Sequence, residues 1–275
     1  MKKILVPTDF SACALAAENY AFQLAKKADA ELVFIHIINT PVDWSKLSKD
    51  QEDFFPDTKK TIVEAKSKLN ELVKKALEKG ILASKLLIYN NGTVKIHEYV
   101  ALEKIDLVVM GSHGQYGFKD HILGTNTYSM LRRSKVPVIV VKQNIVKTKL
   151  KTLVVATNLR EETGQSFKSI EKLAEAFGAN IKMVYVNTPT YFLETNDIMH
   201  LGKEYLREFA NYDHEIHVID AFKEERGILQ FAGNLDADGI AVVTAGKSDL
   251  MQYFSPSITE NLISITDLPV ISIRK

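Results

Sequence analysis

Short apolar runs alternate along this chain with longer stretches in which apolar residues recur at helical spacing. The runs are continuous rather than interrupted by polar residues, which indicates strands buried on both faces. Such strands predict a parallel sheet with helices on both sides, a doubly wound α/β fold. In the first half the predicted strands are Lys3–Pro7, Glu31–Ile38, Lys85–Tyr89, Leu107–Met110 and Val138–Lys142.

Helices are predicted between these strands, near residues 11–28, 59–79, 93–104 and 125–133. The second has the clearest pattern, because its apolar residues recur on one face of a helix. Gly80 follows it and is expected to end the helix, since glycine accepts the left-handed conformation common at that point. The apolar face carries Ile62, Ala65, Leu69, Leu72, Val73 and Ala76.

The same order of segments occurs twice. Each half begins with an apolar run that ends in Thr and then Asp or Asn, has a second strand followed by Thr-Pro, and closes on a Pro-Val strand. Matches in one order favour a duplication over chance similarity. We therefore predict two domains, residues 1–146 and 147–275, each a five-stranded unit with the strand order 3-2-1-4-5. The matched segments are residues 3–9 and 151–158, Glu31–Asn39 and Asn180–Asn187, and Val136–Val141 and Leu268–Ile273.

Composition excludes several classes of protein. The 275 residues include 35 basic and 34 acidic side chains, a net charge of +1, which argues against a broad nucleic-acid-binding surface. No apolar stretch reaches the ~18 residues of a membrane span and no signal peptide follows Met1, so we expect a cytoplasmic protein without membrane contact. Cys13 has no second cysteine to pair with, and we expect it to pack as a small apolar residue.

The most informative stretch follows the strand that ends at Met110. It contains Gly111 and Gly114, then nine residues, then Gly124 and Thr125 at the start of a predicted helix. Glycine lets backbone N–H groups approach phosphate oxygens closely, and a helix N-terminus offers unpaired N–H groups with a partial positive charge. The arrangement predicts a loop that holds a phosphate chain.

This spacing resembles the ATP-binding branch of the universal stress protein family, whose motif is G-x-x-G, nine residues, then G-[ST]. The family also has an Asp at the end of its first strand, matched by Asp9. Its second strand often ends in His and an apolar residue, matched by His36 and Ile37. The resemblance covers both halves, but the ligand motif occurs only in the first. It implies a tandem universal stress protein, a stress-response or regulatory protein with ATP as cofactor, with or without Mg²⁺.

By that resemblance, the adenine lies at the ends of the first two strands. Asp9 and Ile37 would face the base, and Pro7 and Thr8 would form the wall beside it. A simpler interpretation of Asp9 alone is that it caps the helix beginning near Ser11, as Asp commonly does. The glycine loop favours the nucleotide-binding interpretation.

The ribose and phosphates would lie against the glycine loop. Asn126 departs from the small apolar residue usual there, although its backbone N–H still serves. Two histidines of the loop, His113 and His121, invite a catalytic or metal-binding interpretation, but no Asp, Glu or Cys cluster at ligand spacing joins them. We expect no metal site and no catalytic residue in the protein itself. The residues assigned to this side are Met110, Gly111, His113, Gly114, Gly124, Thr125 and Asn126.

The second half has lost the motif, which predicts a single nucleotide site per chain. Proline lacks the N–H group that a phosphate would need at the helix start. A Gly-Lys-Ser at 246–248 lacks the upstream glycine of a P-loop. In the alignment of the halves, Ala245 and Ser248 stand opposite Gly111 and Gly114, Pro256-Ser257 opposite Gly124-Thr125, and Asn158 opposite Asp9.

Family members commonly pair through their final strands, so the resemblance implies that Val138–Lys142 and Val270–Arg274 pair within the chain as a pseudo-dimer. An uncovered apolar edge strand is prone to such pairing. The nucleotide is expected between the ends of the first and fourth strands, where the strand order reverses. The protein partner is unknown, and further homo-oligomers stay open.

Two other functions stay open. The chain could activate a substrate with ATP, although residues 7–11 lack the Ser-Gly-Gly-type loop of related α/β enzymes. It could also be an interaction module whose glycine loop is vestigial. No positioned general base stands out, so slow ATP hydrolysis at most is expected. The segment 43–57, which contains Trp44, Phe54 and Phe55, is either a lid over the site or a contact surface.

Overall fold

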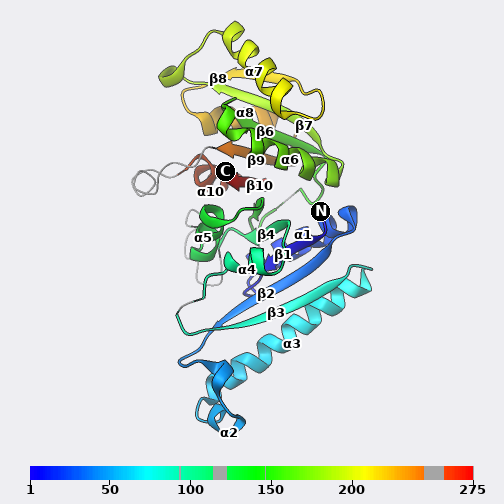
Figure 1. The fold of residues 1–275 in the computed structure, drawn as a ribbon, viewed down its shortest axis with the longest axis vertical. Helices are drawn as coiled ribbons and strands as arrows, with labels where there is room; N and C mark the ends of the chain where they lie inside the picture. Colours follow the sequence, from blue (N-terminus) through cyan, green and yellow to red (C-terminus); the bar gives the residue numbers. More distant parts are fainter. Residues whose placement is uncertain (93, 114–122, 146, 245–256, 275) are drawn as a thin grey trace.

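The computed structural model describes residues 1–92, 94–113, 123–145, 147–244 and 257–274. Its strands form one sheet that runs the length of the molecule (Figure 1). The strands of the first half are β1 Lys3–Pro7, β2 Glu31–Asn39, β3 Ala83–Asn90, β4 Leu107–Gly111 and β5 Val138–Val141. Those of the second half are β6 Thr152–Thr157, β7 Asn180–Asn187, β8 Ile216–Asp220, β9 Gly239–Thr244 and β10 Val270–Arg274.

The order of the strands across the sheet is β3-β2-β1-β4-β5-β10-β9-β6-β7-β8. Each half therefore has the order 3-2-1-4-5, and the pairs within each half are parallel. This confirms the predicted doubly wound topology. Strand ends differ from the prediction by at most two residues. The largest difference is at β3, whose outer position in the sheet leaves its side chains partly buried or exposed.

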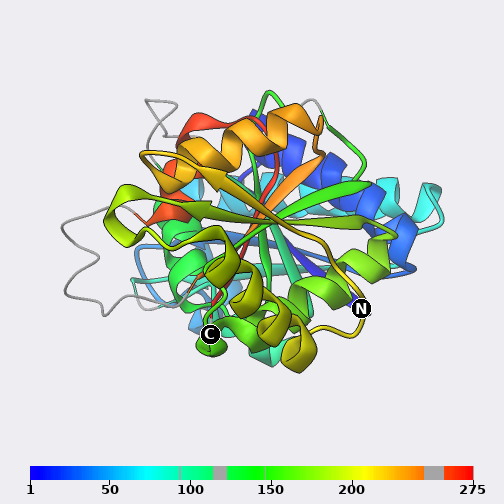
Figure 2. The same ribbon diagram turned by 90° about the horizontal axis from the view of Figure 1, so that it is seen from above.

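Helices cover both faces of the sheet (Figure 2). One face is covered by α1, α3, α6 and α7, and the other by α4, α5, α8 and α10. Among the residues described, no helix combines the length and the apolar character needed to cross a bilayer. The helices are α1 Ala12–Ala28, α2 Lys49–Glu52, α3 Pro56–Glu78, α4 Glu98–Leu102, α5 Thr125–Arg133, α6 Gly164–Phe177, α7 Thr195–Phe209, α8 Glu224–Asn234 and α10 Ile258–Ile265.

The core consists of two apolar layers, one on each face of the sheet, and both layers continue from one half into the other. Successive strand residues alternate between them: Ile4 and Val6 enter the layer under α1, and Leu5 enters the opposite one. Because both faces are covered, these strands read as continuous apolar runs in the sequence.

The α3 helix shows how local sequence determines an element. Pro56 stands in its first turn, where the missing N–H costs nothing. The predicted apolar face is confirmed, with Val73 alone only partly buried. Gly80 follows the helix with φ +74°, the left-handed conformation expected of it. The helix predicted near 93–104 is shorter, since α4 spans only Glu98–Leu102.

The two halves join edge to edge through their last strands, as predicted. The pair is antiparallel, with Ile139 opposite Ile271, Val138 opposite Ser272 and Val140 opposite Val270. Aligning the halves makes Ile139 and Ile271 equivalent, so a pseudo-two-fold axis passes through this residue pair. Ion pairs also cross the junction, for example between Arg132 Nε of α5 and Glu260 Oε1 of α10 at 4.0 Å. The chain thus forms its own pseudo-dimer.

The duplication is visible in atomic detail. The carboxylate of Asp106 accepts hydrogen bonds from the first backbone N–H groups around β1, and Asp238 does the same for β6. Phe10 and Leu159, two residues beyond Thr8 and Thr157, both have positive φ angles, +63° and +56°. Residues other than glycine rarely adopt this backbone conformation. Its occurrence at matching positions supports a common origin of the halves.

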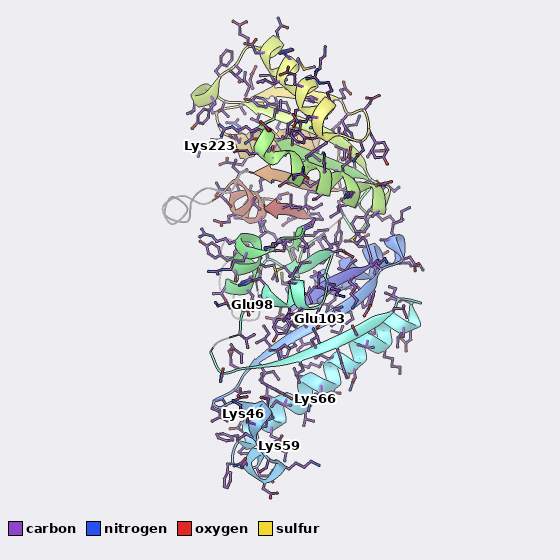
Figure 3. The ribbon with its side chains drawn as sticks, in the orientation of Figure 1. Lys46, Lys59, Lys66, Glu98, Glu103 and Lys223 are labelled. Carbon is purple, nitrogen blue, oxygen red and sulfur yellow. The ribbon has the colours of Figure 1, made fainter. Side chains whose placement is uncertain are left out.

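The segment 43–57 folds onto the outer end of the first half. Trp44 is buried beside Phe55 and Tyr89, with ring centroids 6.2 and 6.5 Å away. Here α2 lies at the end of the molecule beyond β3 (Figure 1), and Lys46 and Lys59 project from this region (Figure 3). The segment therefore has an apolar core of its own, formed with residues of β2 and α3.

Candidate functional site

The turn after β1 begins the site. Pro7 is buried at the end of the strand and pairs with Ile35 of β2. Thr8 is also buried, and its backbone N–H donates to the carbonyl of Ile35 at 2.9 Å. The Thr8 hydroxyl accepts a hydrogen bond from the N–H of Phe10 at 3.0 Å. Backbone and side chain together place the following residue, Asp9, at the carboxyl edge of the sheet.

Asp9 is partly buried, and its Oδ1 accepts a hydrogen bond from the N–H of Ser11 at 3.1 Å. The cap of α1 is Ser11, whose side chain accepts from the N–H of Ala14. The interpretation of Asp9 as the helix cap is therefore wrong. Its carboxylate instead lies two residues earlier, in the turn between β1 and α1.

The end of β2 lies beside this turn. His36 is partly buried, and its Nδ1 is 2.7 Å from the carbonyl oxygen of Thr8. Burial lowers the pKa of His36, while the bond to Thr8 opposes that shift. Ile37 is half-buried in β2 opposite Ile88 of β3. The residues predicted for the adenine side therefore lie on two adjacent strand ends.

The end of β4 supplies the opposite side. Met110 is buried, and the carbonyl of Gly111 accepts a hydrogen bond from the Thr127 hydroxyl at 2.9 Å. A Cβ added to Gly111 would lie 2.9 Å from Sγ of Cys13 and 3.0 Å from its carbonyl oxygen. Packing against α1 is thus sufficient reason for a glycine here. Cys13 is buried, as predicted.

The N-terminus of α5 stands next to this strand end. Gly124 is its N-cap, with φ −62° and ψ 147°, and no side chain within the described ranges caps the helix. The N–H of Gly124 donates to the carbonyl of Ser112 at 2.9 Å. Thr125 and Asn126 form an exposed first turn. The backbone conformation of Gly124 is open to any residue, so its chain geometry alone does not require glycine.

The corresponding helix of the second half is capped differently. The side chain of Ser257 accepts from the N–H of Glu260 at 3.2 Å, and the Glu260 carboxylate accepts from the N–H of Ser257 at 3.3 Å. This reciprocal pair is a capping box. Side chains therefore satisfy N–H groups at the start of α10, whereas no side chain of the described residues does so at the start of α5.

Parts of the predicted site lie outside the described residues. Gly114 and His121 are among them, as are Ala245, Ser248 and Pro256 of the second half. His113 is described, and its Nδ1 lies 3.0 Å from the Ser112 hydroxyl. Within the described ranges, no group of three or more His, Cys, Asp or Glu side chains is placed to hold a metal ion.

One further residue lies beside the site and is absent from the residues predicted for it. Glu18 of α1 is only 3% exposed, and its Oε1 accepts a hydrogen bond from the Thr8 hydroxyl at 2.6 Å. The available signal was its position: Ala17 and Ala21 flank it on a helix whose neighbouring residues are buried and apolar. A glutamate within such a run indicates a buried partner.

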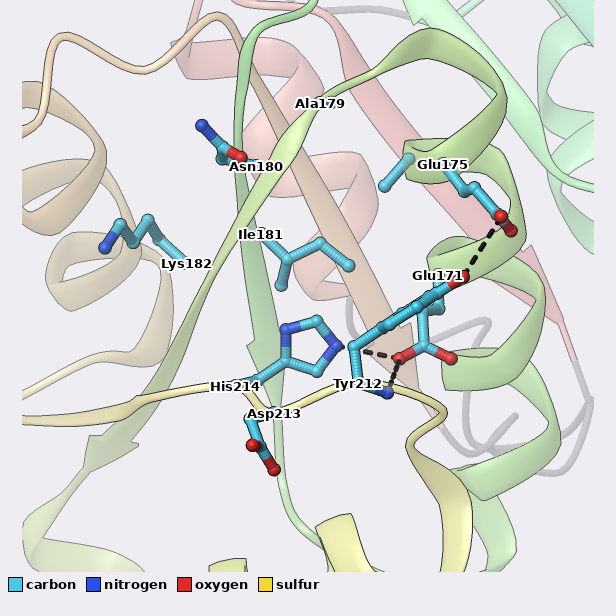
Figure 4. A pocket seen from close by; sticks show the side chains of 10 residues that line it. Glu171, Glu175, Ala179, Asn180, Ile181, Lys182, Tyr212, Asp213 and His214 are labelled. Carbon is cyan, nitrogen blue, oxygen red and sulfur yellow. Dashed lines mark hydrogen bonds and ion pairs between the residues drawn. The ribbon is translucent and has the colours of Figure 1, made fainter.

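A pocket of about 380 Å³ lies in the second half and contains none of the residues predicted for the site (Figure 4). Glu171 of α6 forms its wall and is 2% exposed. Its carboxylate accepts from the backbone N–H groups of Asn211 and Tyr212 and lies 2.8 Å from Nε2 of His214. These hydrogen bonds use the Glu171 carboxylate to attach the connection between α7 and β8 to α6. The buried carboxylate at this pocket therefore has a structural role.

Comparison with known proteins shows what kind of molecule this is. A model of the universal stress protein family matches residues 1–142. The chain belongs to the universal stress protein family. Universal stress protein MJ0577 of Methanocaldococcus jannaschii is 28% identical over 154 residues, which cover 52% of this chain and 95% of that protein.

Solved universal stress proteins extend the comparison to the fold. One from Archaeoglobus fulgidus covers 99% of this chain, with 98% of its own length matched, at 20% identity and a TM-score of 0.76. Its likeness shows that the same fold extends over both halves. Another member, described as a complex with cAMP, is 23% identical and covers 51% of this chain and 96% of its own, with a TM-score of 0.40.

Proposed function

We propose that this universal stress protein binds ATP or a closely related adenine nucleotide in its first half, and that occupancy regulates a protein partner. The observation that carries the proposal is the N-terminus of α5. Gly124 caps it without a side-chain hydrogen bond, and its first turn is exposed. A helix start of this kind presents N–H groups and a partial positive charge, both of which favour phosphate.

The neighbourhood of α5 also suits a nucleotide. The hydrogen bond from Thr127 to Gly111 ties the helix start to the end of β4. β1 is the adjacent strand, so the turn that carries Asp9 lies at the same edge of the sheet. The strand order reverses between β1 and β4, and ligands of open α/β sheets bind at such a point.

The residues on the β1 side would recognise the base. A carboxylate oxygen accepts more than one hydrogen bond, so Asp9 can accept from an adenine amino group in addition to the N–H of Ser11. Ile37, half-buried on β2, offers an apolar contact to the ring. On the other side, the N–H groups of Thr125 and Asn126 would face the phosphates. Mg²⁺ arriving with the nucleotide would be held mainly by phosphate oxygens, as is usual for this ion.

We expect one nucleotide per chain. Among the described residues no side chain caps the start of α5, whereas the capping box of α10 holds the Glu260 carboxylate against the start of that helix, where it would repel a phosphate. Calorimetric titration with ATP should therefore give a stoichiometry near one, about the value that a single available helix start implies. The same titration with ADP, AMP and cAMP ranks the preferred nucleotide, and cAMP is included because one family member is described with it.

Mass spectrometry of the purified chain under native conditions supplies an independent measurement, because a tightly held nucleotide copurifies. Two equivalent sites per chain would contradict the assignment of the second half as degenerate. Failure to bind any of these nucleotides would overturn the proposed function and favour an interaction module with a vestigial loop.

A further inference from the structure

Glu18 is a buried carboxyl in the half that carries the proposed nucleotide site. It lies in α1, with 3% of its surface exposed, and it holds the Thr8 hydroxyl at 2.6 Å. Removing a carboxylate from water costs free energy unless partners compensate. Glu18 directly contacts Thr8, a residue of the predicted adenine wall. The burial of a glutamate at this position therefore calls for an explanation.

Thr8 connects this carboxyl to the turn that carries Asp9. The Thr8 hydroxyl accepts a hydrogen bond from the N–H of Phe10 at 3.0 Å. The backbone carbonyl oxygen of Thr8 lies 2.7 Å from Nδ1 of His36. Phe10 has a φ of +63°, a value that residues other than glycine rarely adopt. Thr8 thus holds a strained turn, and Glu18 fixes the orientation of the hydroxyl that does so.

The second half has the same turn without the carboxyl. Thr157 accepts from the N–H of Leu159 at 3.1 Å. In the gap-free alignment that matches these turns and the ends of α1 and α6, Phe167 stands where the first half has Glu18, and it is fully buried. Its ring lies beside that of Tyr205, a neutral side chain, with the ring centroids 5.7 Å apart. The fold therefore accepts an apolar residue at this position, and the carboxyl occurs only in the half with the glycine loop.

We propose that Glu18 is a positioning residue of the nucleotide site: it fixes the Thr8 hydroxyl, and thereby the turn that presents Asp9, in a manner that depends on its ionisation. The inference rests on the proposed function. Glu18 itself does not contact the nucleotide in this proposal. Its ionisation makes the nucleotide affinity of the first half depend on pH.

The charged groups around Glu18 come from three elements. Burial raises its pKa; the hydrogen bond from Thr8 and the charge of Lys75 oppose that rise, and the charge of Asp9 adds to it. On the α3 side, Lys68 and Glu71 line the same small pocket as Glu18 and Lys75. On the β2 side, His36 is separated from Glu18 by Thr8.

The direction of the pH effect follows from these contacts. An ionised carboxylate accepts a hydrogen bond roughly twice as strong as a neutral acceptor does. As the pH falls through the raised pKa of Glu18, its carboxyl takes up a proton and its bond to Thr8 weakens. The turn then holds Asp9 less firmly, and nucleotide affinity falls. The loss should begin at a higher pH than an ordinary glutamate would give.

The test compares the ATP affinity of the full chain with that of its Glu18→Gln variant across a pH series that runs from neutral pH down into the acid range. Glutamine keeps the size of the side chain but stays neutral. We expect about fivefold weaker binding by the variant at the neutral end of the series, the difference between a charged and a neutral hydrogen bond. The ratio of the two affinities should approach one at the acid end. Titration of the nucleotide phosphates and of His36 is common to both proteins and cancels in the ratio.

Glu171→Gln is the matched control. This substitution removes a carboxylate of similar burial from α6, the helix of the second half that corresponds to α1. The Glu171→Gln variant should bind ATP with the same affinity as the unmodified chain at each pH measured. An equal loss in both variants would show that reduced stability, and not positioning, causes the effect.

A second comparison tests whether Glu18 acts through Thr8. Glu18→Gln should have no further effect on affinity in a Thr8→Val background, because the hydroxyl that it positions is gone. Additive effects would overturn the proposed route. Unchanged affinity and pH profile in Glu18→Gln would overturn the inference while leaving the proposed function intact. If the unmodified chain bound none of the adenine nucleotides, the proposed function itself would be refuted.

Discussion

Replacing Gly124 by valine is expected to abolish nucleotide binding and leave the protein folded. A branched side chain at the N-cap would occupy the space in front of the α5 amides, where the phosphates are proposed to lie. The fold should tolerate it, because Gly124 has φ −62° and ψ 147°, values that any residue adopts. The steric conflict with phosphate is therefore the reason for the expected loss, and backbone strain is not.

Calorimetry measures the affinity, and circular dichroism with thermal unfolding checks the fold. Gly233→Val is the control, since Gly233 is an exposed glycine of α8 with no atom near the position of an added Cβ. Unchanged affinity in a folded Gly124→Val protein would refute the assignment of α5 to phosphate. The same loss is predicted for Gly114→Val, at a position outside the described residues.

Residues 1–146 alone are expected to associate with themselves. Removing the second half uncovers the edge of β5, with its apolar Val138, Ile139 and Val140. Unpaired apolar edges readily add another strand. In the full chain the pseudo-two-fold axis passes through Ile139 and Ile271, so two copies of the fragment can pair with Ile139 opposite Ile139. The expected product is a symmetric dimer.

Sedimentation equilibrium over a wide concentration range measures this association. In the full chain β10 already occupies the β5 edge. Sedimentation equilibrium of the full chain therefore shows whether the uncovered β5 edge causes the self-association of the fragment. A folded fragment that stays monomeric throughout would count against pairing through β5. Domain boundaries after residue 146 remain a prediction, which limited proteolysis of the full chain can test.

The junction has a consequence for how the two halves influence each other. α5, whose start is the proposed phosphate site, packs against β10 and reaches Glu260 of α10 through Arg132. Glu260 is also the residue that completes the α10 capping box. Lys142, which follows β5, donates to the carbonyl of Ser264 near the other end of α10. The second half is thus bonded at both ends of this helix to the half that carries the proposed site.

Much of the architecture could be predicted from local sequence. The continuous strands and helical periodicities require only neighbouring residues, and the repetition of their order predicts two units. Gly111, Gly124 and Thr125 could be located because close backbone approach and helix starts have local signatures. The capping box of Ser257 and Glu260 has a local signature as well, S-x-x-E.

The tertiary structure decided the features that depend on residues far apart in the chain. Only packing shows that Gly111 is required by Cys13 of α1, and only the sheet shows the antiparallel register centred on Ile139 and Ile271. The bond between Glu18 and Thr8 likewise depends on how α1 lies across β1. Sequence alone therefore determined which elements form and in what order, because hydrophobic periodicity acts between near neighbours. Packing determined which of their side chains meet, because burial and hydrogen bonding join elements that the sequence keeps apart.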